Sequence, residues 1–507
     1  MPDTYFITTP IYYVNDIPHI GHAYTSIATD FIARYKRMSG VKTMFLTGTD
    51  EHGQKIQKAA EKKSIEPIDL CDKNSAKFRE LTKILNLSND DFIRTTEKRH
   101  IEGAESLWNK LLDSDDIYLD YYKGWYSVSD ETFYNEKDLI KQNDDTFKTI
   151  TGGPVEWIEE ESYFFKLSKY SDKLLKLYEE YPNFIMPKSR KNEVISFVKS
   201  GLRDLSISRN TFDWGIKVPN DKKHIMYVWL DALSSYPNSL GYISNNNSEL
   251  SSYWSNTVHI VGKDILRHHA VYWPAFLMSA NLDLPKRIFA HGWWTNEGSK
   301  ISKSSGNAID PIEIIGQFGL DQIRYFLLRE ITFGSDGDFS ISALKSRINA
   351  DLSNDLGNLC QRSLTMIVKH CDSIVPSGSQ ITKSDKEFLS KISNDLIGFS
   401  SLVENQEINI YIKKIWDIVG EANKYFNDHK PWELKDSNKA VFENVLYVTA
   451  DIIKQIGVMI YPIMPDTSKK ILNFFLINEK NISLESLKIN IENKNINNIK
   501  PLFPRVE

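Results

Sequence analysis

Residues 5–22 read YFITTPIYYVNDIPHIGH, and this stretch decides the fold. Its first part, residues 5–9, is a run of aromatic and β-branched side chains that predicts a buried strand. Proline, asparagine and aspartate then mark a loop. Beyond the loop, Ala23, Ile27 and Phe31 recur with the spacing of one helix face. The order of strand, loop and helix predicts the first unit of an α/β domain.

The same alternation of strands and helices returns further along the chain. Apolar, strand-like runs occupy residues 43–47, 258–262 and 287–295, with helical patterns between them. Such alternation predicts a Rossmann-type parallel sheet, whose ligands bind beyond the carboxyl ends of the strands. Four polar side chains follow the first two strands: His19, His22, Asp50 and His52.

The regions between and after the two α/β halves differ in composition. Residues 116–225 are aromatic and β-prone, which predicts an inserted subdomain. The last third of the chain has helical periodicity with polar exposed faces. We therefore predict an α/β fold with a split parallel sheet and an α-helical C-terminal domain. The predicted boundaries are 1–115 and 226–300 for the two halves of the sheet domain, 116–225 for the connective insertion, 301–345 for a lysine loop and linker region, and 346–507 for the helical domain.

Composition excludes several classes of protein. The 507 residues are 41% hydrophobic and 25% charged, which is typical of a folded chain rather than a disordered one. The net charge of -5 gives no overall basic field, so a nucleic-acid partner would need a local patch. The three cysteines form no Cys-x2-Cys pair, and neither a signal-like N-terminus nor a bilayer-length apolar run is present. We expect a soluble, cytoplasmic protein.

The first motif that could carry chemistry is HIGH, which ends the opening stretch. His19 and His22 stand at a loop-to-helix junction, where backbone N–H groups already favour a phosphate. Two imidazoles would add hydrogen-bond donors to that site. The alternatives are a helix-capping pair of histidines, or half of a metal site with Asp50 and His52.

The second motif is the loop NEGSKISKSSGN, residues 296–307. Lys300 and Lys303 could grip a polyphosphate and close over it, whereas the alternative is a solvated basic loop. The order and spacing of the two motifs, with a large insertion between them, resemble the two signature motifs of class I aminoacyl-tRNA synthetases.

Further strings make the resemblance more specific. PIYYVNDIPHIGH, TGTDEHG, YVWLDALSSY, VGKDILRHHAVYWPAFL, AHGWWT and SKISKSSGN together look like methionyl-tRNA synthetases. The resemblance implies that the Rossmann-type domain is followed by an α-helical anticodon-binding domain. It also implies a methionine pocket formed by Ile11, Tyr13, Asp50, Trp229, Leu233, Tyr236, Ile265, His269 and Trp273.

The chemistry of these residues agrees with a methionine pocket. Ile265, His269 and Trp273 lie at i, i+4 and i+8, which predicts one stripe of one helix. Asp50 would pair with the substrate ammonium, and aromatic walls suit a polarizable thioether. Core packing is the alternative for each aromatic side chain, and for Leu233 and Ile265 both interpretations stand.

The resemblance also implies an ATP site. Gly262 and Asp264 would border the ribose, and His291, Gly292 and Trp293 would lie at the adenine. The phosphates would be bound by the two signature motifs, through His19, His22, Lys300 and Lys303. The alternative for Asp264 is a cap in the first turn of a helix.

In the helical domain, the resemblance places five residues against a CAU anticodon. Asn354, Asn358 and Arg362 lie at i, i+4 and i+8, with Pro431 and Trp432 nearby. Amides, a guanidinium and an aromatic ring are the groups that read unstacked bases. The alternative is an ordinary exposed polar helix face.

Two departures from the family pattern bear on metal binding and on the lysine loop. Many methionyl-tRNA synthetases carry zinc knuckles in the insertion, but the corresponding positions here are Ser127, Asp130, Lys148 and Thr151, and none is a thiolate. We therefore predict no structural zinc. Ile301 replaces the methionine usual in the lysine motif, a swap of similar apolar volume that should preserve the loop.

The activity implied by the resemblance is that of a methionine–tRNA ligase. Such an enzyme activates L-methionine with ATP and Mg²⁺ to methionyl-adenylate, then charges initiator and elongator methionine tRNA. The chain ends without the extra domain that makes some relatives dimers, so we expect a monomer, with no membrane partner. The alternatives are a simpler nucleotidyltransferase with the same His-x-Gly-His element and a catalytically silent tRNA-binding relative.

Overall fold

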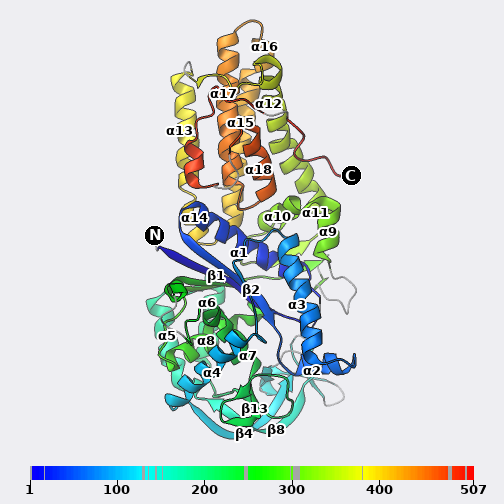
Figure 1. Cartoon of the computed structure of the whole chain (residues 1–507), viewed down its shortest axis with the longest axis vertical. Helices are drawn as coiled ribbons and strands as arrows, with labels where there is room; N and C mark the ends of the chain where they lie inside the picture. The colour runs from blue at the N-terminus through cyan, green and yellow to red at the C-terminus, as the bar shows by residue number, and fades with distance from the viewer. Residues whose placement is uncertain are drawn as a thin grey trace.

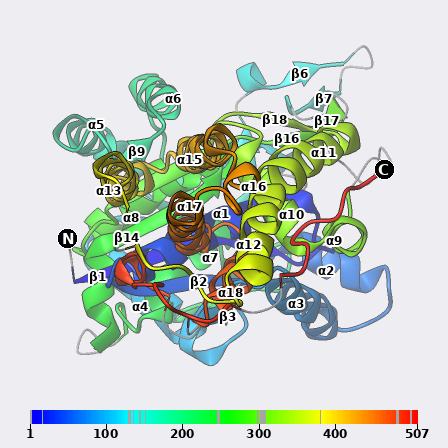
Figure 2. The ribbon, with the colours of Figure 1, turned by 90° about the horizontal axis from the view of Figure 1, so that it is seen from above.

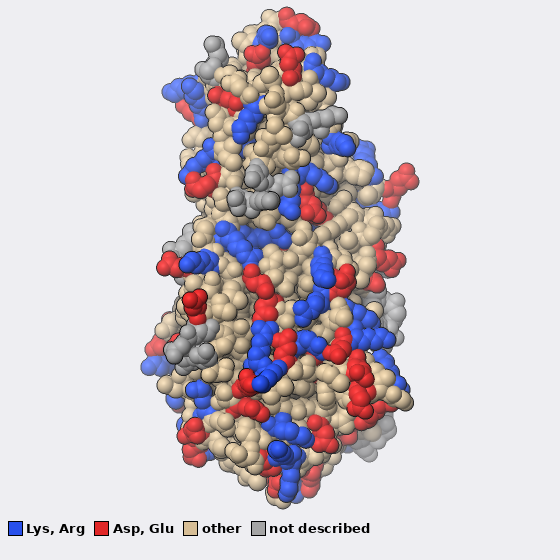
Figure 3. All heavy atoms as spheres, viewed as in Figure 1, with Lys and Arg blue, Asp and Glu red and all other residues tan. Residues whose placement is uncertain are grey.

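The computed structural model describes residues 3–15, 17–127, 132–134, 136–142, 146–150, 152–244, 249–296, 299–300, 309–378, 381–477, 482–496 and 499–507. The molecule is elongated, with the C-terminal helices at one end, the parallel sheet in the middle and the inserted β structure at the other end (Figure 1). Basic and acidic side chains are interspersed over the face shown in Figure 3, in keeping with the small net charge of -5.

Six parallel strands form the central sheet in the order β3-β2-β1-β14-β15-β9. In that order their bounds are Asp91–Arg94, Lys42–Asp50, Thr4–Tyr13, Thr257–Gly262, Arg287–His291 and Ile185–Met186. The central strands are buried, which explains their nearly continuous apolar sequences. From β1 the strand order continues through β2 and β3 towards one edge of the sheet, and through β14 and β15 towards the other. Ligands of such sheets bind beyond the carboxyl ends of the strands at this switch point, between β1 and β14. The predicted α/β fold is confirmed.

Helices cover this sheet and connect its strands. They are α1 (Ile20–Met38), α2 (Gln54–Glu61), α3 (Pro67–Ile84), α4 (Lys98–Asp113), α7 (Val228–Ser239) and α8 (Trp273–Ser279). Among them α1 is almost entirely buried, because it lies between the sheet and the C-terminal helices (Figures 1 and 2).

The insertion is mainly antiparallel β structure, as its composition predicted. β4 (Ile117–Ser127) pairs with β8 (Glu156–Phe165) from Ile117 opposite Phe165 to Tyr126 opposite Glu156. The flanking elements are β5 (Thr132–Tyr134), β10 (Leu205–Ser206), β11 (Ser208–Arg209), β12 (Lys217–Val218), β13 (Asp221–Met226), α5 (Ser171–Glu180) and α6 (Lys188–Lys199). β9 comes from the same part of the chain but pairs with β15, so this region also supplies one edge of the central sheet.

The C-terminal region is helical, as predicted. Its helices are α9 (Pro311–Phe318), α10 (Leu320–Arg329), α11 (Ile341–Arg347), α12 (Asn358–His370), α13 (Lys383–Ile397), α14 (Ser400–Glu404), α15 (Ile408–His429), α16 (Pro431–Leu434), α17 (Lys439–Met459) and α18 (Pro465–Phe474). The described residues after α18 are mostly irregular, and Ile491, Ile496 and Phe503 among them are buried.

The helix that carries His269 is not a regular α-helix. It begins with a 3-10 turn at Lys263–Ile265, continues as a π-helix over His268–Tyr272 and becomes α8 at Trp273. Pro274 has no N–H to donate to the carbonyl group of Ala270, and the Tyr178 hydroxyl donates to that oxygen instead, at 2.6 Å. The predicted single α-helical stripe is therefore wrong in its geometry.

A second π-helix, Ile348–Gly357, joins α11 to α12. A Cβ atom at Gly357 would lie 2.9 Å from the carbonyl oxygen of Leu352, so glycine removes a steric barrier to the wide turn. Asn354 lies inside this π-helix and Asn358 begins α12. The chain between the two asparagines therefore follows the wider turns of a π-helix rather than those of a regular α-helix.

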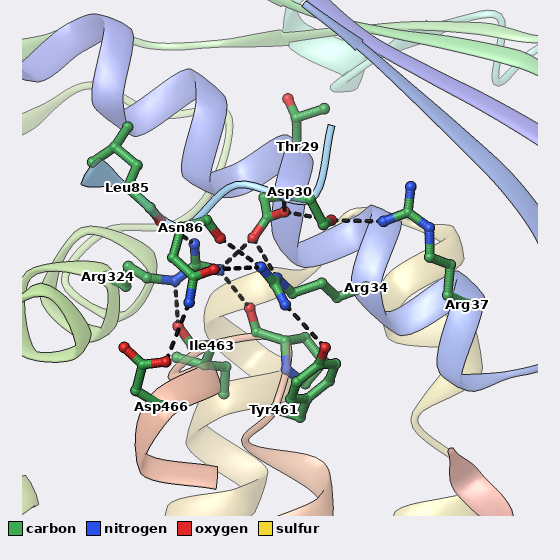
Figure 4. A network of polar contacts seen from close by, with 12 residues as sticks. Thr29, Asp30, Arg34, Arg37, Leu85, Asn86, Arg324, Tyr461, Ile463 and Asp466 are labelled. Carbon is green, nitrogen blue, oxygen red and sulfur yellow. Dashed lines mark hydrogen bonds and ion pairs between the residues drawn. The ribbon is translucent and has the colours of Figure 1, made fainter. Parts of the chain in front are cut away.

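A buried polar network joins α1 to the C-terminal helices (Figure 4). Asp30 Oδ2 accepts from Arg34 Nε and from Arg324 Nη2, both at 2.7 Å. Arg324 also donates to the backbone oxygens of Leu85 and Ile463, at 3.1 and 2.8 Å. Burial alone would raise the pKa of Asp30, but the two guanidinium groups lower it below its ordinary value. The charged groups at this domain junction are therefore paired and hydrogen-bonded.

Candidate active site

His19 and His22 form a reciprocal cap on the N-terminus of α1. His19 Nδ1 accepts from the Gly21 N–H, and His22 Nδ1 accepts from the His19 N–H, both at 3.1 Å. The ring centroids lie 3.9 Å apart. A Cβ at position 21 would lie 2.9 Å from His19 Cε1, so a larger residue than glycine would displace the His19 ring. The two histidines therefore cap the helix, as in the first alternative. Because each Nδ1 atom accepts a hydrogen bond, the neutral rings carry their protons on Nε2.

The structure does not support the alternative interpretation, a metal site that these histidines would form with Asp50 and His52. His52 Nδ1 lies 2.6 Å from Asp231 Oδ2, and His100 Nε2 lies 2.6 Å from Asp231 Oδ1. Burial opposes the charge on Asp231, but the two imidazoles lower its pKa to about 2. In the described parts of the chain, no group of three or more His, Cys, Asp or Glu side chains could hold a metal ion.

Asp231 and His100 were not identified from the sequence. They are separated from His52 by 179 and 48 positions, so no local pattern joins them. One available signal was a carboxylate among the apolar residues of the first turns of α7, where Asp231 is fully buried. Its position fixes the polar loop after β2, because it holds His52 on that loop.

The structure brings Tyr236 and His269 of the predicted methionine pocket into direct contact. His269 Nδ1 donates to the carbonyl oxygen of Ile265 at 3.0 Å, so its Nε2 accepts from the Tyr236 hydroxyl, at 2.7 Å. Burial lowers the pKa of His269 to about 4, so the ring is neutral at pH 7. A neutral, hydrogen-bonded polar pair therefore lies within a mostly apolar region.

The other predicted pocket residues lie on elements around this pair. Tyr13 on β1 is the direct partner of Asp50 on β2, and Ile11 is the partner of Gly48. Leu233 lies with Tyr236 on α7, and both are buried. The structure thus places these residues at the carboxyl ends of β1 and β2 and on the helix beside them.

The two tryptophans of the predicted pocket have different surroundings. Trp229 stacks on His268 with ring centroids 3.8 Å apart. Trp273 is fully buried against Trp254, and its Nε1 has no hydrogen-bond partner in the described parts of the chain. An unpaired buried donor of this kind is costly to stability.

His259 is a further pocket-side residue that sequence reasoning missed. Its ring centroid lies 4.4 Å from that of Tyr236 and 6.0 Å from that of His269. Its Nδ1 lies 2.8 Å from Thr8 Oγ1, whereas its Nε2 is buried without a partner among the described residues. A histidine in the centre of an apolar strand was the signal that could have identified it.

Burial of histidines near the pocket predicts loss of stability in acid. Burial lowers the pKa of His269 to about 4, and those of His259 and His268 well below the ordinary value. Between about pH 6.5 and pH 4, the unfolded chain binds protons that the native state excludes. We therefore expect the free energy of unfolding to fall by about 1.4 kcal/mol per pH unit for each such histidine.

Urea titrations at pH 6.5 and 5.5 measure this slope. His269→Gln should reduce the loss of stability between these two pH values by about 1 kcal/mol, whereas the same change at exposed His370 should leave it intact. An unaltered slope in His269→Gln would show that His269 accepts a proton in the folded state.

The predicted ATP residues gather at the ends of β14 and β15. Trp293 Nε1 donates to Asp264 Oδ1 at 3.1 Å. A Cβ at Gly262 would lie 2.5 Å from the same carboxylate oxygen, and one at Gly292 would lie 2.3 Å from the backbone of Ser335. Both glycines therefore permit close approach of neighbouring groups.

His291 is buried rather than exposed in the predicted nucleotide site. Its Nδ1 donates to the Gly292 carbonyl oxygen at 2.8 Å, and its Nε2 lies 2.8 Å from Thr25 Oγ1 on α1. Burial lowers its pKa. The ring therefore ties the end of β15 to α1.

The lysine motif is described only in part. β16 (Trp294–Asn296) pairs antiparallel with β17 (Ser299–Lys300) and parallel with β18 (Gly337–Phe339). The backbone of Lys300 is opposite Thr295, but its side chain and all of Lys303 lie outside the described part of the chain. Their predicted roles remain predictions.

Two of the predicted anticodon residues, Arg362 and Trp432, lie close together in the helical domain. The guanidinium of Arg362 lies 5.3 Å from the ring centroids of Phe426 and Trp432, and its Nη1 donates to Asn427 Oδ1 at 3.1 Å. Trp432 is 41% exposed at the start of α16, next to Pro431. Arg362 and Trp432 thus form a cation–π contact that is partly accessible to solvent.

Two family descriptions match most of the chain. "tRNA synthetases class I (M)" matches residues 5–143 and 141–364, and "Anticodon-binding domain of tRNA ligase" matches residues 385–501. The split parallel sheet and the histidine-capped helix lie in the region of the first match, and the helical domain contains the region of the second. Together they define a class I aminoacyl-tRNA synthetase.

Similar proteins narrow the class. The methionine–tRNA ligase of Rickettsia felis is 53% identical over 484 residues, covering 95% of this chain and 93% of the relative, and that of Brucella suis is 51% identical over 475 residues, covering 94% and 92%. Mycobacterium tuberculosis methionyl-tRNA synthetase in complex with methionyl-adenylate superposes with a TM-score of 0.97 at 45% identity, covering 99% of this chain and 100% of that one. This chain belongs to the methionine–tRNA ligase family, as the sequence motifs predicted.

Proposed function

We propose that this chain activates L-methionine with ATP and transfers the methionyl group to the terminal adenosine of methionine tRNA. The observation that carries the proposal is the neutral Tyr236–His269 pair in an aromatic region, alongside a helix N-terminus capped by two histidines. The first feature suits a thioether side chain and the second suits a phosphate.

Amino-acid-dependent exchange of labelled pyrophosphate into ATP tests the proposal. Exchange should require methionine and should not occur with any other standard amino acid at comparable concentration. Strong exchange with a different amino acid would reassign the pocket. Exchange without any amino acid would favour a simpler nucleotidyltransferase, and no exchange at all would favour a silent tRNA-binding protein.

Activation would proceed by direct displacement. A methionine carboxylate oxygen attacks the α-phosphorus of ATP in line, which forms methionyl-adenylate and releases pyrophosphate. His19 and His22 would donate from Nε2 to phosphoryl oxygens, while Lys300 and Lys303 hold the pyrophosphate side. A ribose hydroxyl of the terminal adenosine then attacks the adenylate carbonyl, and AMP leaves. Catalysis is thus positioning together with electrostatic stabilisation.

The amino acid would be held by charge at one end and by packing at the other. Asp50 would accept hydrogen bonds from the substrate ammonium, since it is beside Tyr13 at the carboxyl ends of two neighbouring strands. Trp229, Tyr236 and His269 would surround the thioether. A neutral His269 suits this role because a charged ring would be poorly matched to an apolar side chain.

Mg²⁺ is expected to enter with ATP. The described groups at the phosphate end of the site, two imidazole Nε2–H donors and the first turn of α1, suit phosphate oxygens rather than a cation. Mg²⁺ bound to the phosphates would neutralise their charge during transfer.

We expect the purified protein to contain less than one zinc per chain. Ser127 is buried at the end of β4 and Lys148 is exposed, while Asp130 and Thr151 lie outside the described residues. Neither described position offers a thiolate. Elemental analysis should give a clearly substoichiometric zinc content, and a chelator should not unfold the chain. One tightly bound zinc per chain would contradict the prediction.

The anticodon surface predicts a separation of two activities. Trp432→Ala and Arg362→Ala should each weaken aminoacylation of tRNA by about 1–3 kcal/mol, because one base loses its stacking partner. Methionine-dependent pyrophosphate exchange should remain nearly unchanged, since these residues lie in the helical domain, far along the molecule from the sheet (Figure 1). Equal losses in both assays would show that the pair supports the fold instead.

We further propose a cytoplasmic monomer that charges both initiator and elongator methionine tRNAs. The three cysteines, Cys71, Cys360 and Cys371, are free thiols, which suits a reducing compartment. None of the helices in the described parts of the chain is long and apolar enough to cross a membrane. Light scattering of the purified protein tests the oligomeric state, and charging of each tRNA tests the acceptor range.

A further inference from the structure

The loop that follows β2 is held on two sides. Glu51 and His52 come directly after Asp50, the carboxylate proposed to bind the substrate ammonium. On one side, the Glu51 carboxylate accepts from the guanidinium of Arg94 on β3 through both oxygens, at 2.7 and 2.9 Å. On the other side, His52 contacts Asp231 in the first turn of α7. Asp50 is therefore followed by two residues that are fixed to different elements of the fold.

The Asp231 carboxylate is shared between two histidines. His52 Nδ1 lies against one oxygen and His100 Nε2 against the other, each at 2.6 Å. Because an ionised carboxylate only accepts hydrogen bonds, both imidazoles donate. The side chains of Asp231 and His100 are fully buried, and that of His52 is 8% exposed. Charge-assisted hydrogen bonds shielded from water in this way are strong and directional.

The His100 side of this arrangement is firmly anchored. α4 and α7 approach closely at Gly103, where a Cβ atom would lie 2.0 Å from Asn238 Oδ1. Asn238 Nδ2 donates to the His100 carbonyl oxygen at 3.1 Å. The contact between the two helices thus fixes Asp231, and Asp231 in turn fixes His52.

His52 connects Asp231 to the predicted methionine pocket. Its carbonyl oxygen accepts from the Tyr13 hydroxyl at 3.0 Å, and Tyr13 is the direct strand partner of Asp50. Burial, and after it the negative charge of Asp50, raises the pKa of the Tyr236 hydroxyl on α7. Asp50 therefore lies within electrostatic range of the helix that Asp231 holds.

The same helix carries the residues proposed to surround the thioether. Trp229, Leu233 and Tyr236 lie at i, i+4 and i+7 of α7, which places them on one face. Asp231 is two positions beyond Trp229, about 200° around the helix, and so belongs to the opposite face. One face of α7 thus holds the loop after β2, while the other forms the predicted pocket wall.

We propose that Asp231 is a positioning residue for the amino acid, because it sets the distance between Asp50 and the pocket wall on α7. An amino acid bound by its ammonium at Asp50 and by its side chain at the wall must match that distance. The hydrogen bond between Asp231 and His52 therefore contributes to selection for side-chain length. Asp231 acts through His52 and α7 rather than by contact with the substrate. The proposal rests on the proposed activation of methionine.

Selection between amino acids of different length tests this role. S-Methyl-L-cysteine is one methylene shorter than methionine, and L-ethionine is one methylene longer. The kcat/KM of pyrophosphate exchange is measured with all three amino acids for the native enzyme and for Asp231→Asn. The asparagine amide keeps the shape of the side chain but can accept from only one of the two imidazoles. Ratios of kcat/KM between amino acids do not depend on the folded fraction, so a simple loss of stability leaves them unchanged.

The native enzyme should prefer methionine over each analogue by about 10–200-fold, the usual effect of one methylene in an apolar pocket. Asp231→Asn should reduce at least one of these preferences several-fold and raise the KM for methionine, with little change in the KM for ATP. Identical preferences in the native enzyme and the variant, whatever their size, would overturn the positioning role. If the native enzyme shows no exchange with methionine, the proposed function itself fails.

Two substitutions of His52 test the same hydrogen bond from its other end. The side-chain amide of asparagine can place its N–H group near the position of imidazole Nδ1, so His52→Asn retains the donor. His52→Leu removes it. We expect His52→Leu to weaken the selection for length and His52→Asn to restore most of it. Equal effects of the two substitutions would show that the hydrogen bond does not set the selection.

Asp116→Asn is the matched control for loss of a buried carboxylate. Asp116 is 1% exposed and accepts from Lys169 Nζ and Ser279 Oγ, both at 2.7 Å. It precedes β4 in the insertion, so its substitution should lower stability and leave the preferences for methionine unchanged. A loss of selection as large as that in Asp231→Asn would show a general effect of destabilisation and would overturn the proposal.

Discussion

Replacing Asp30 with asparagine is expected to lower the free energy of unfolding by about 3–5 kcal/mol, the usual cost of removing one partner from a buried ion pair. Arg324 and Asp30 are both fully buried, and Arg34 binds the same carboxylate oxygen. The substitution keeps the side-chain shape but leaves two buried guanidinium groups close together without their counter-charge. Urea-induced unfolding, followed by circular dichroism, measures the loss.

The matched control is Asp90→Asn. Asp90 also pairs with an arginine of α1, Arg37, at 2.6 Å, but the two side chains are 42% and 29% exposed. Such a pair contributes about 0–1 kcal/mol, so this variant should be close to the native protein. Similar losses for the two variants would show that burial does not set the energetics of the domain junction.

The junction also predicts a functional difference. Arg324 binds the backbone of residues 462 and 463 in the helical domain, while Asp30 belongs to α1, whose first turn carries the two histidine caps. In Asp30→Asn we expect aminoacylation to fall more than pyrophosphate exchange, because the anticodon surface loses its fixed position relative to the sheet. An equal fall in both would indicate global loss of structure.

Lys303→Ala is expected to reduce the rate of methionine-dependent pyrophosphate exchange by a factor of 10²–10³, or about 3 kcal/mol, with little change in the KM for methionine. The lysine would act on pyrophosphate charge that develops in the transition state, so its loss should appear in kcat. Initial-rate kinetics with varied methionine and ATP measure both constants.

Lys383→Ala is the control for this lysine. Lys383 is exposed at the start of α13, and its contact with Glu387 is an exposed ion pair, so its loss should not alter exchange. An unchanged kcat in Lys303→Ala would remove the lysine loop from the mechanism. A large rise in the KM for methionine would instead place the loop near the amino acid.

Several features were predictable from the sequence because they depend on neighbouring residues. The strand of residues 5–9 and the helix that contains Ala23 and Ile27 follow from hydrophobic periodicity, and both are present in β1 and α1. The cap formed by His19 and His22 needs only residues three positions apart. The pocket residues came from the family resemblance, and their residue types could not have fixed their contacts.

Other features were predicted wrongly or were missed because they depend on contacts between distant parts of the chain. The π-helix before Trp273 arises where Pro274 removes a helical donor. The carbonyl oxygen of Ala270 accepts a hydrogen bond from the Tyr178 hydroxyl instead, almost a hundred positions earlier in the chain. The spacing pattern alone predicted a regular α-helix there. Propensity and periodicity describe a helix in isolation, and tertiary hydrogen bonds can change its turns.

Local backbone geometry and hydrophobic patterning were enough to predict the α/β class and the helical C-terminal domain, whereas the histidine cap was one of several alternatives that the sequence left open for His19 and His22. Three contacts could be seen only once the chain was folded: Asp231 with both His52 and His100, Arg324 with α1, and Arg505 with Asn354. Each of these is a pairing of polar groups from distant segments. Its geometry exists only after apolar packing has brought the segments together and made an unpaired polar group costly.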